Sequence, residues 1–118
     1  MAITIDQYRA LQPKTTKYRN KITLVDGIRF DSKAEAKRWI KLRELYHQGV
    51  ITKLGRQPKY PFHLHGKLMF TYIADFKYTD VHTGIEIIED VKGVKTPIYN
   101  LKKKIIQEMY GFTITEVK

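Results

Sequence analysis

The chain has 118 residues, a formal net charge of +10 and 42% hydrophobic residues, a composition that argues against disorder and suits one domain with a modest core. It has no cysteine, which excludes disulfides and thiolate metal sites. No apolar run approaches the ~20 residues of a membrane span and no signal-peptide pattern opens the chain, so we expect a cytoplasmic protein without a membrane partner. The positive charge makes a polyanion the first partner to consider.

Residues 1–21 are predicted to form an N-terminal basic arm or short helix. Residues 3–11 could form the helix, and residues 12–21 are polar and basic. Two interpretations of the basic stretch stay open. It is either a solvated linker or an arm that lies along nucleic-acid phosphates.

Residues 22–30 have the pattern of a hairpin with Asp26-Gly27 as its turn, and a helix follows over residues 32–49 with Ser32 as N-cap. Glu35 comes three residues after this cap, so it could simply complete a capping box. On a helical wheel of ~100° per residue, however, Glu35 falls inside the arc predicted to be buried, which favours a site residue. That arc comprises Ala36, Trp39, Ile40, Leu42 and Tyr46.

The second half of the chain alternates between strand and helix patterns. Strands are predicted over residues 50–54, 59–64 and 67–78, and the last of these forms a hairpin with the strand that ends at Gly93. Thr96 caps a second helix with Pro97 at its first position, and residues 112–117 form a final strand. The predicted buried stripe of this helix is Ile98, Leu101, Ile105 and Met109. The fold class is therefore α/β, a mixed β-sheet flanked by helices.

Acidic residues stand in both strands of the later hairpin where apolar residues would be expected. Asp75 lies in the first strand, and Asp90 and Lys92 flank Val91 in the second, so their side chains share a face. With Glu35 they make three carboxylates, which can hold one or two Mg²⁺ (or Mn²⁺) ions, and the Val91 backbone carbonyl is a further candidate ligand.

A metal at this place would activate water and neutralise charge on a phosphodiester. Lys92 would orient or deprotonate that water, or stabilise the transition state; these roles stay open. The alternative is an exposed, salt-bridged strand face, which leaves Glu35 and the basic charge unexplained.

In this order, Glu35, Asp75 and Asp90-Val91-Lys92-Gly93 resemble the signature of the PD-(D/E)xK nucleases, most closely the phage four-way-junction resolvases of the endonuclease I type. The chain is also similar to a family of small phage nuclease-like proteins. The segments that carry this second likeness are residues 17–21, 26–33, 57–58 and 89–93.

The resemblance implies a restriction-endonuclease-like core and a nuclease domain over residues 22–118. It implies a metal-dependent endonuclease that hydrolyses phosphodiester bonds in branched DNA such as Holliday junctions, in phage recombination or packaging. The protein would then act in the host-cell cytoplasm. A homodimer is implied as well, since resolvases cut two strands symmetrically.

Two positions depart from the resolvase pattern. Ala74 stands where the motif has proline, and Asp90 where these resolvases usually carry glutamate. Glu89 is adjacent, but alternation along a strand should point it to the opposite face, so Asp90 takes the role and Glu89 stays as an alternative. Gln57 is a further candidate, since a glutamine enters the site in some relatives.

The basic residues supply candidate phosphate contacts, which would make affinity fall steeply with salt. They are Lys14, Lys17, Arg19, Lys21, Lys102, Lys103 and Lys104. No helix-turn-helix or zinc-finger pattern is present, so recognition of DNA shape is expected over base-specific reading. His63 and His65 are interpreted as a solvated pair. Two alternatives stay open: the same fold acting on duplex or transposon ends, or a non-catalytic nucleic-acid binding module.

Overall fold

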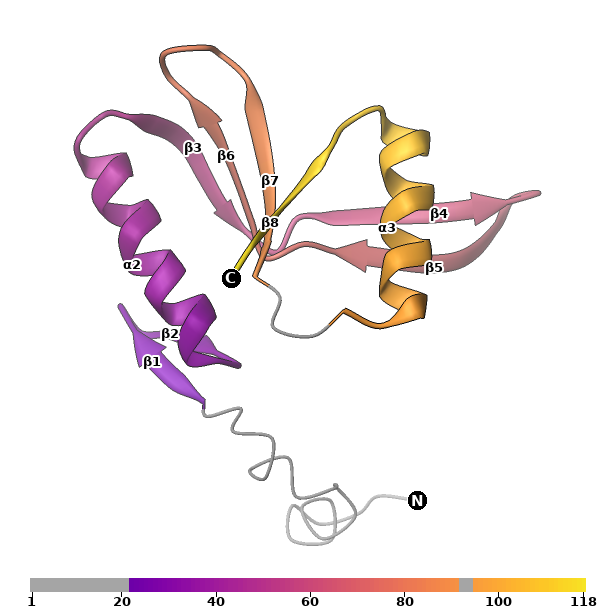
Figure 1. Ribbon diagram of the computed structural model, residues 1–118, viewed down its shortest axis with the longest axis horizontal. Coiled ribbons are helices and arrows are strands. Elements are labelled where there is room, and N and C mark those ends of the chain that lie inside the picture. Colours follow the sequence, from indigo (N-terminus) through magenta and orange to yellow (C-terminus); the bar gives the residue numbers. More distant parts are fainter. Residues whose placement is uncertain (1–21, 92–94) are drawn as a thin grey trace, which may run out of the picture. The chain divides into compact units, whose positions relative to one another are not determined.

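The computed structural model describes residues 22–91 and 95–118. The chain divides into two compact units, Met1–Lys37 and Arg38–Lys118, and each is described by itself. Figure 1 gives the order of the elements along the chain. The N-terminal arm or short helix predicted over residues 1–21 lies outside the described residues. Within the described part of the chain, no helix is long and apolar enough to cross a membrane.

The first unit contains a short antiparallel hairpin of β1 (Thr23–Val25) and β2 (Ile28–Phe30). Its turn residues Asp26 and Gly27 have positive φ angles of 55° and 74°. Such angles at both positions match the twist of the strands and are what an Asp-Gly pair provides at low cost. The predicted hairpin is confirmed.

Helix α2 (Lys33–His47) begins in the first unit and continues into the second. The Ser32 hydroxyl accepts a hydrogen bond from the Glu35 N–H at 3.2 Å, so Ser32 is the N-cap. In the second unit Leu42 is fully buried, and the Trp39 ring stacks on Phe76 with 6.1 Å between centroids. The expectation that Tyr46 is buried is wrong: it is 47% exposed, because it lines an open pocket.

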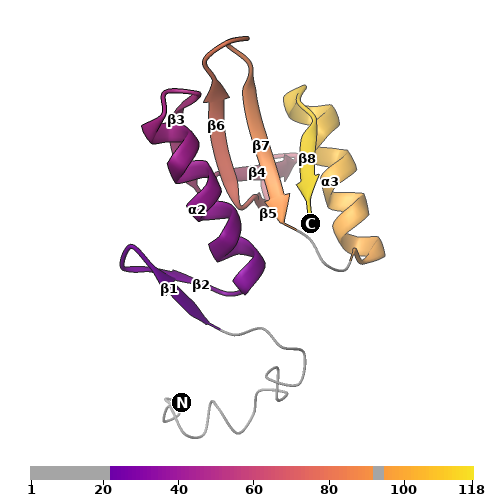
Figure 2. The same ribbon diagram turned by 60° about the vertical axis from the view of Figure 1, so that its left-hand side comes forward.

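A four-stranded sheet forms the centre of the second unit. It comprises β3 (Ile51–Arg56), β6 (Phe76–Asp80), β7 (Glu86–Val91) and β8 (Ile114–Val117), in the order β3-β6-β7-β8. The first two pairings are antiparallel and β7 pairs with β8 in parallel, so the sheet is mixed (Figure 2). The described residues thus form two helices and eight strands, and the mixed α/β class is confirmed.

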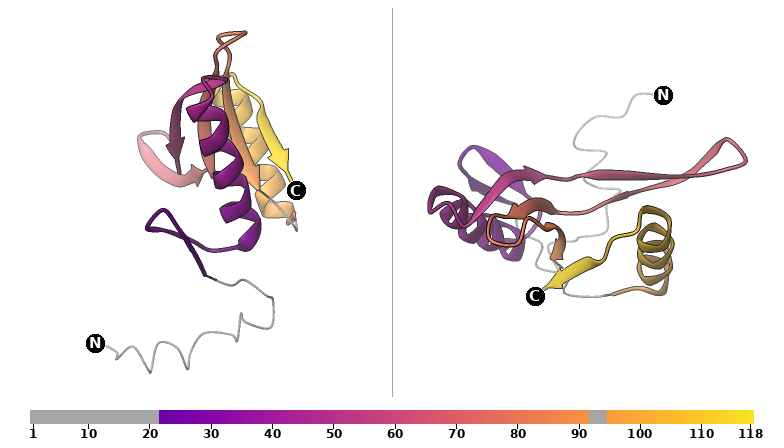
Figure 3. Two further views of the ribbon diagram at one scale, coloured as in Figure 1. Left: turned by 90° about the vertical axis from the view of Figure 1, so that its left-hand side faces the viewer. Right: turned by 90° about the horizontal axis from the view of Figure 1, so that it is seen from above.

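A separate two-stranded ribbon is formed by β4 (Lys59–Leu64) and β5 (Lys67–Ile73), and Figure 3 shows it as an extended hairpin. The single strand predicted over residues 67–78 is therefore wrong, because it breaks at Ala74 and Asp75. The Ala74 N–H still bonds to the Pro58 carbonyl at 3.1 Å, whereas the Asp75 N–H bonds to the Glu89 carbonyl at 3.0 Å. The chain changes sheets at this point.

Helix α3 (Pro97–Tyr110) has the predicted caps. The Thr96 hydroxyl accepts from the Tyr99 N–H at 3.1 Å, and Gly111 ends the helix with a φ of 75°. Its predicted buried stripe is wrong, because Ile98, Leu101 and Met109 are 65%, 58% and 50% exposed.

The inner face of α3 instead carries Tyr99, Lys103 and Ile106. Tyr99 and Ile106 lie one residue on from the predicted Ile98 and Ile105, which is about 100° of helix rotation. Ile106 is fully buried in a core cluster. The members of this cluster are Tyr72, Ala74, Ile88, Ile106 and Ile114. Tyr99 and Lys103 turn inward because the sheet offers them polar partners, which are described next.

Candidate functional site

Asp75 lies where the ribbon ends and the mixed sheet begins, and it is bonded to both neighbouring segments. Its Oδ2 atom accepts a hydrogen bond from the Val91 N–H at 2.7 Å, and its own N–H donates to the Glu89 carbonyl. The Gln57 N–H donates to the Asp75 carbonyl at 3.0 Å. Three segments that the sequence singles out, at Gln57, Asp75 and Glu89 to Val91, therefore meet at one end of β6 and β7.

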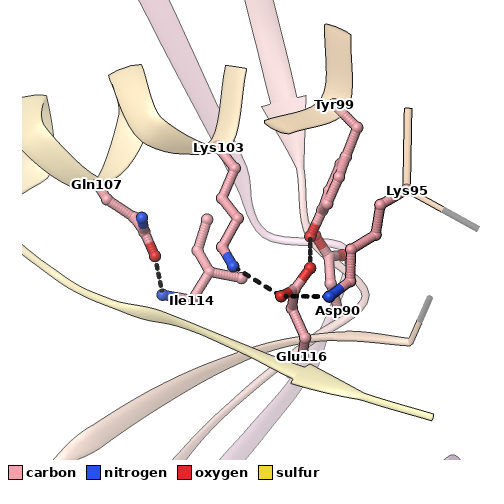
Figure 4. A network of polar contacts seen from close by, with 7 residues as sticks. All are labelled: Asp90, Lys95, Tyr99, Lys103, Gln107, Ile114 and Glu116. Carbon is pink, nitrogen blue, oxygen red and sulfur yellow. Dashed lines mark hydrogen bonds and ion pairs between the residues drawn. The ribbon is translucent and has the colours of Figure 1, made fainter. Parts of the chain in front are cut away.

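Asp90 is fully buried, and its side chain lies against α3. The Tyr99 hydroxyl is 3.2 Å from Asp90 Oδ2 and 3.1 Å from Glu116 Oε2, so one phenol joins the two carboxylates (Figure 4). Asp90 and Glu116 are register partners on β7 and β8, which places them side by side. Burial has the largest effect on the pKa of Tyr99 and raises it, and the negative charge of Asp90 raises it further. This hydroxyl therefore stays protonated and can donate.

Two lysines hold Glu116 from the other side. The Glu116 Oε1 atom is 3.0 Å from Lys103 Nζ and 3.1 Å from Lys95 Nζ. The hydrogen bond from Lys103, assisted by those from Lys95 and Tyr99, lowers the pKa of Glu116 from 4.5 to about 2, against the opposing effect of burial. Glu116 is thus a charged carboxylate that links the Asp90 strand to α3.

This network should make the protein sensitive to acid. Since the pKa of Glu116 is lower in the folded chain than in the unfolded chain, its stabilising effect is complete above pH 4.5 and disappears as the pH falls toward about 2. We expect Glu116→Gln to lower the free energy of unfolding at neutral pH and to converge with wild type in acid, as measured by urea denaturation across this range. Glu108→Gln, at an exposed position of α3, is the control, and its free energy of unfolding should depend on pH as that of the wild type does. Parallel curves for Glu116→Gln and wild type would contradict the assignment.

Glu89 is also fully buried, but it contacts a different helix. Both of its carboxylate oxygens accept hydrogen bonds from Arg38 on α2, at 2.8 and 2.6 Å, and the Tyr78 hydroxyl donates to the same group. The bond to Glu89 raises the pKa of Arg38, and burial together with Glu89 raises the pKa of Tyr78 to about 12. Glu89 and Asp90 therefore point to different partners, as alternation predicts, and Glu89 is committed to a buried ion pair.

The lysines predicted to contact phosphate from α3 differ in their surroundings. Lys103 is paired with Glu116, the Lys102 ammonium lies 5.3 Å from the centroid of the Phe70 ring, and Lys104 is exposed. The other predicted contacts, Lys14, Lys17, Arg19 and Lys21, lie outside the described residues, as does Lys92. Glu35 belongs to the first unit and the two aspartates belong to the second, and each unit is described by itself. The role of Glu35 beside the aspartates therefore stays a prediction.

A family model described as a protein of unknown function (DUF1064) matches residues 15–116, which is most of the chain. The chain belongs to this family. No curated protein matches it, and no solved structure does. The DUF1064 match includes every residue that the sequence predicts as catalytic, and Glu116 at its last position.

The oxygen atoms of the candidate site in this DUF1064 protein suit a hard cation, although the described residues do not complete a ligand set. Within the described ranges, no three histidine, cysteine or acidic side chains are grouped so that they could hold a metal ion. Mg²⁺, however, is commonly bound through one or two carboxylates, with water and substrate phosphate completing its shell. Asp75, Asp90 and the Val91 carbonyl fit that minimal requirement by their chemistry.

Sequence reasoning missed two residues of the polar network around Asp90, Glu116 and Lys95. A signal for Glu116 was present, because Phe112, Ile114 and Glu116 alternate along the last strand and put an acid where an apolar residue would be expected. Asp75 and Asp90 also stand at strand positions where an apolar residue would be expected. Lys95 had no such signal, since it lies just before α3 and outside any periodic pattern.

Proposed function

We propose that this DUF1064 protein is a Mg²⁺-dependent endodeoxyribonuclease that hydrolyses phosphodiester bonds in branched DNA, with Glu35, Asp75, Asp90 and Lys92 as its catalytic residues. The observation that supports this best is the hydrogen bond from the Val91 N–H to the Asp75 carboxylate. It draws together two acidic positions that are fifteen residues apart in the sequence, 75 and 90, beside the strand end that leads to Lys92.

The proposed chemistry follows from the donor atoms. Asp75, Asp90 and the Val91 carbonyl would hold the cation, which when bound supplies a hydroxide near neutral pH and neutralises charge on the phosphate. The hydrogen bond from the Tyr99 hydroxyl orients the Asp90 carboxylate, and the pairing of β7 with β8 places Asp90 opposite Glu116. The Asp75 carboxylate is fixed in the same way by the Val91 N–H, so both ligands would be pre-positioned.

Affinity for DNA would come from charge. The net charge of +10 favours phosphate binding, and Lys104 is exposed on α3 for direct contact.

We also propose the restriction-endonuclease-like core that the resemblance implies, with the mixed sheet at its centre. The homodimer is a further part of this proposal, and the exposed Ile98, Leu101 and Met109 of α3 would give it an apolar surface. Light scattering should then give the mass of two chains.

Metal removal tests the activity directly. We expect the protein to cut a synthetic four-way DNA junction in Mg²⁺ or Mn²⁺ and to lose all cleavage in excess EDTA, because the metal activates the attacking water. Gel analysis of end-labelled junctions measures both. Cleavage that continues unchanged in EDTA would contradict a metal-dependent site.

The same gel separates the rival functions. Flap, linear duplex and single-stranded DNA are run beside the junction at equal concentration. Preferred cleavage of linear duplex ends would favour a nuclease of the same fold acting on other DNA. Tight binding to all DNA without cleavage in any metal would favour a non-catalytic binding module, in which the Asp90–Tyr99–Glu116 contacts serve only stability.

A further inference from the structure

A pocket of about 370 Å³ lies in the second unit, between the C-terminal half of α2 and strand β3. Its lining is Trp39, Arg43, Tyr46, His47 and Leu54. The volume falls at the lower end of the roughly 300–1,000 Å³ typical of small-molecule sites. None of these residues belongs to the proposed catalytic site.

Helix periodicity explains why the aromatic and cationic side chains meet here. Arg43 comes four residues after Trp39, and Tyr46 and His47 come three and four residues after Arg43, so all four lie along one side of α2. Trp39 is fixed by stacking on Phe76, and the Tyr46 and His47 rings contact edge to face at 5.6 Å between centroids.

Strand β3 supplies the opposite wall. Its pairing with β6 shifts register between Thr52 and Gly55, and Lys53 has a positive φ of 54°. A bulge of this kind places an extra residue in the strand and redirects its side chains. Leu54 follows the distortion directly and lines the pocket.

Aromatic rings, a guanidinium and one apolar wall form a surface that suits a flat aromatic ligand attached to an anion. Bases stack on aromatic side chains, and arginine adds cation–π and phosphate contacts. The net charge of +10 makes a polyanionic strand the natural source of such a group.

We propose that this pocket receives an unstacked base of a nucleic-acid strand, with Arg43 beside the adjoining phosphate. The inference rests on the DNA-binding part of the proposed function and is independent of cleavage. It gives DNA that offers an unpaired base an advantage over uniform duplex.

The single tryptophan of the sequence makes the test direct, because Trp39 lines the pocket. Trp39 emission is followed while a short oligothymidylate, thymidine monophosphate or a blunt duplex of equal length is added in EDTA at low salt. We expect saturable quenching by the oligonucleotide, weaker quenching by the mononucleotide and none by the duplex. Anisotropy of labelled DNA measures binding independently of the indole.

Matched variants locate the binding. Arg43→Ala and Tyr46→Ala should each weaken oligonucleotide binding about fivefold or more, the lower end of the loss seen when a stacking side chain is truncated. Tyr46→Phe should restore the loss, since it keeps the ring, and circular dichroism checks that each variant folds. Lys41→Ala removes one positive charge from an exposed position of the same helix and should have a smaller effect.

Three results would overturn the proposal: oligonucleotide binding that saturates without any change in Trp39 emission, equal quenching by the blunt duplex, or equal losses for Arg43→Ala and Lys41→Ala. Each leaves the proposed nuclease standing. Failure to bind any DNA at low salt would instead remove both proposals.

Discussion

Replacing Lys92 with alanine should reduce cleavage of a four-way junction in Mg²⁺ by about 10²–10⁴-fold, the range that a positioned proton-transfer group contributes. The residue follows Val91 in the sequence, and the Val91 N–H is bonded to the proposed metal ligand Asp75. Single-turnover rates at saturating protein measure the chemical step without interference from binding.

The control for this variant is Lys67→Ala, which removes one positive charge from an exposed position of β5. It should cut at nearly the wild-type rate, and both variants should bind the junction with similar affinity in EDTA. If Lys92→Ala cuts as fast as the parent protein, the assignment of the site is wrong.

The largest expected effect on stability comes from Arg38→Met. This change leaves the Glu89 carboxylate fully buried without the cation that holds both of its oxygens, so the free energy of unfolding should fall by about 3–5 kcal/mol. Urea denaturation followed by circular dichroism measures it. Lys77→Met is the matched control, because it breaks an exposed pair with Glu86 at 3.9 Å and should cost no more than about 1 kcal/mol.

A set of combined variants separates the ion pair from simple loss of packing. Arg38→Met with Glu89→Leu removes both charges and should recover most of the loss, and adding Tyr78→Phe removes the hydroxyl that would otherwise lose its acceptor. A double variant as unstable as Arg38→Met alone would show that packing of the arginine stem, and not the buried charge, makes the difference.

The elements that sequence reasoning predicted correctly are those fixed by local chemistry. Asp26-Gly27 takes up the positive φ angles of a tight turn, Ser32 and Thr96 bond to backbone N–H groups three residues on, and Gly111 ends its helix in the left-handed region. Each of these needs only its neighbours in sequence. The mixed sheet flanked by helices follows from their order.

The features that it missed depend on partners distant in sequence. The break at Asp75 requires the Glu89 carbonyl and the Val91 N–H, and neither is visible from the apolar pattern of residues 67–78. The rotation of α3 has a similar cause. Hydrophobicity favoured Ile98, Leu101 and Met109 as the inner face, whereas hydrogen bonds and ion pairs to the sheet turned Tyr99 and Lys103 inward.

Parallel pairing of β7 with β8 has a consequence for how the chain assembles. Until residues 114–117 arrive, the strand that carries Asp90 has β6 on one side and an open backbone edge on the other. Closing that edge requires the whole of α3 to cross over first, a non-local step that is intrinsically slow. A nascent chain would therefore leave one edge of its acidic strand unpaired until β8 has been made, and in that state pairing with a neighbouring copy competes with correct closure.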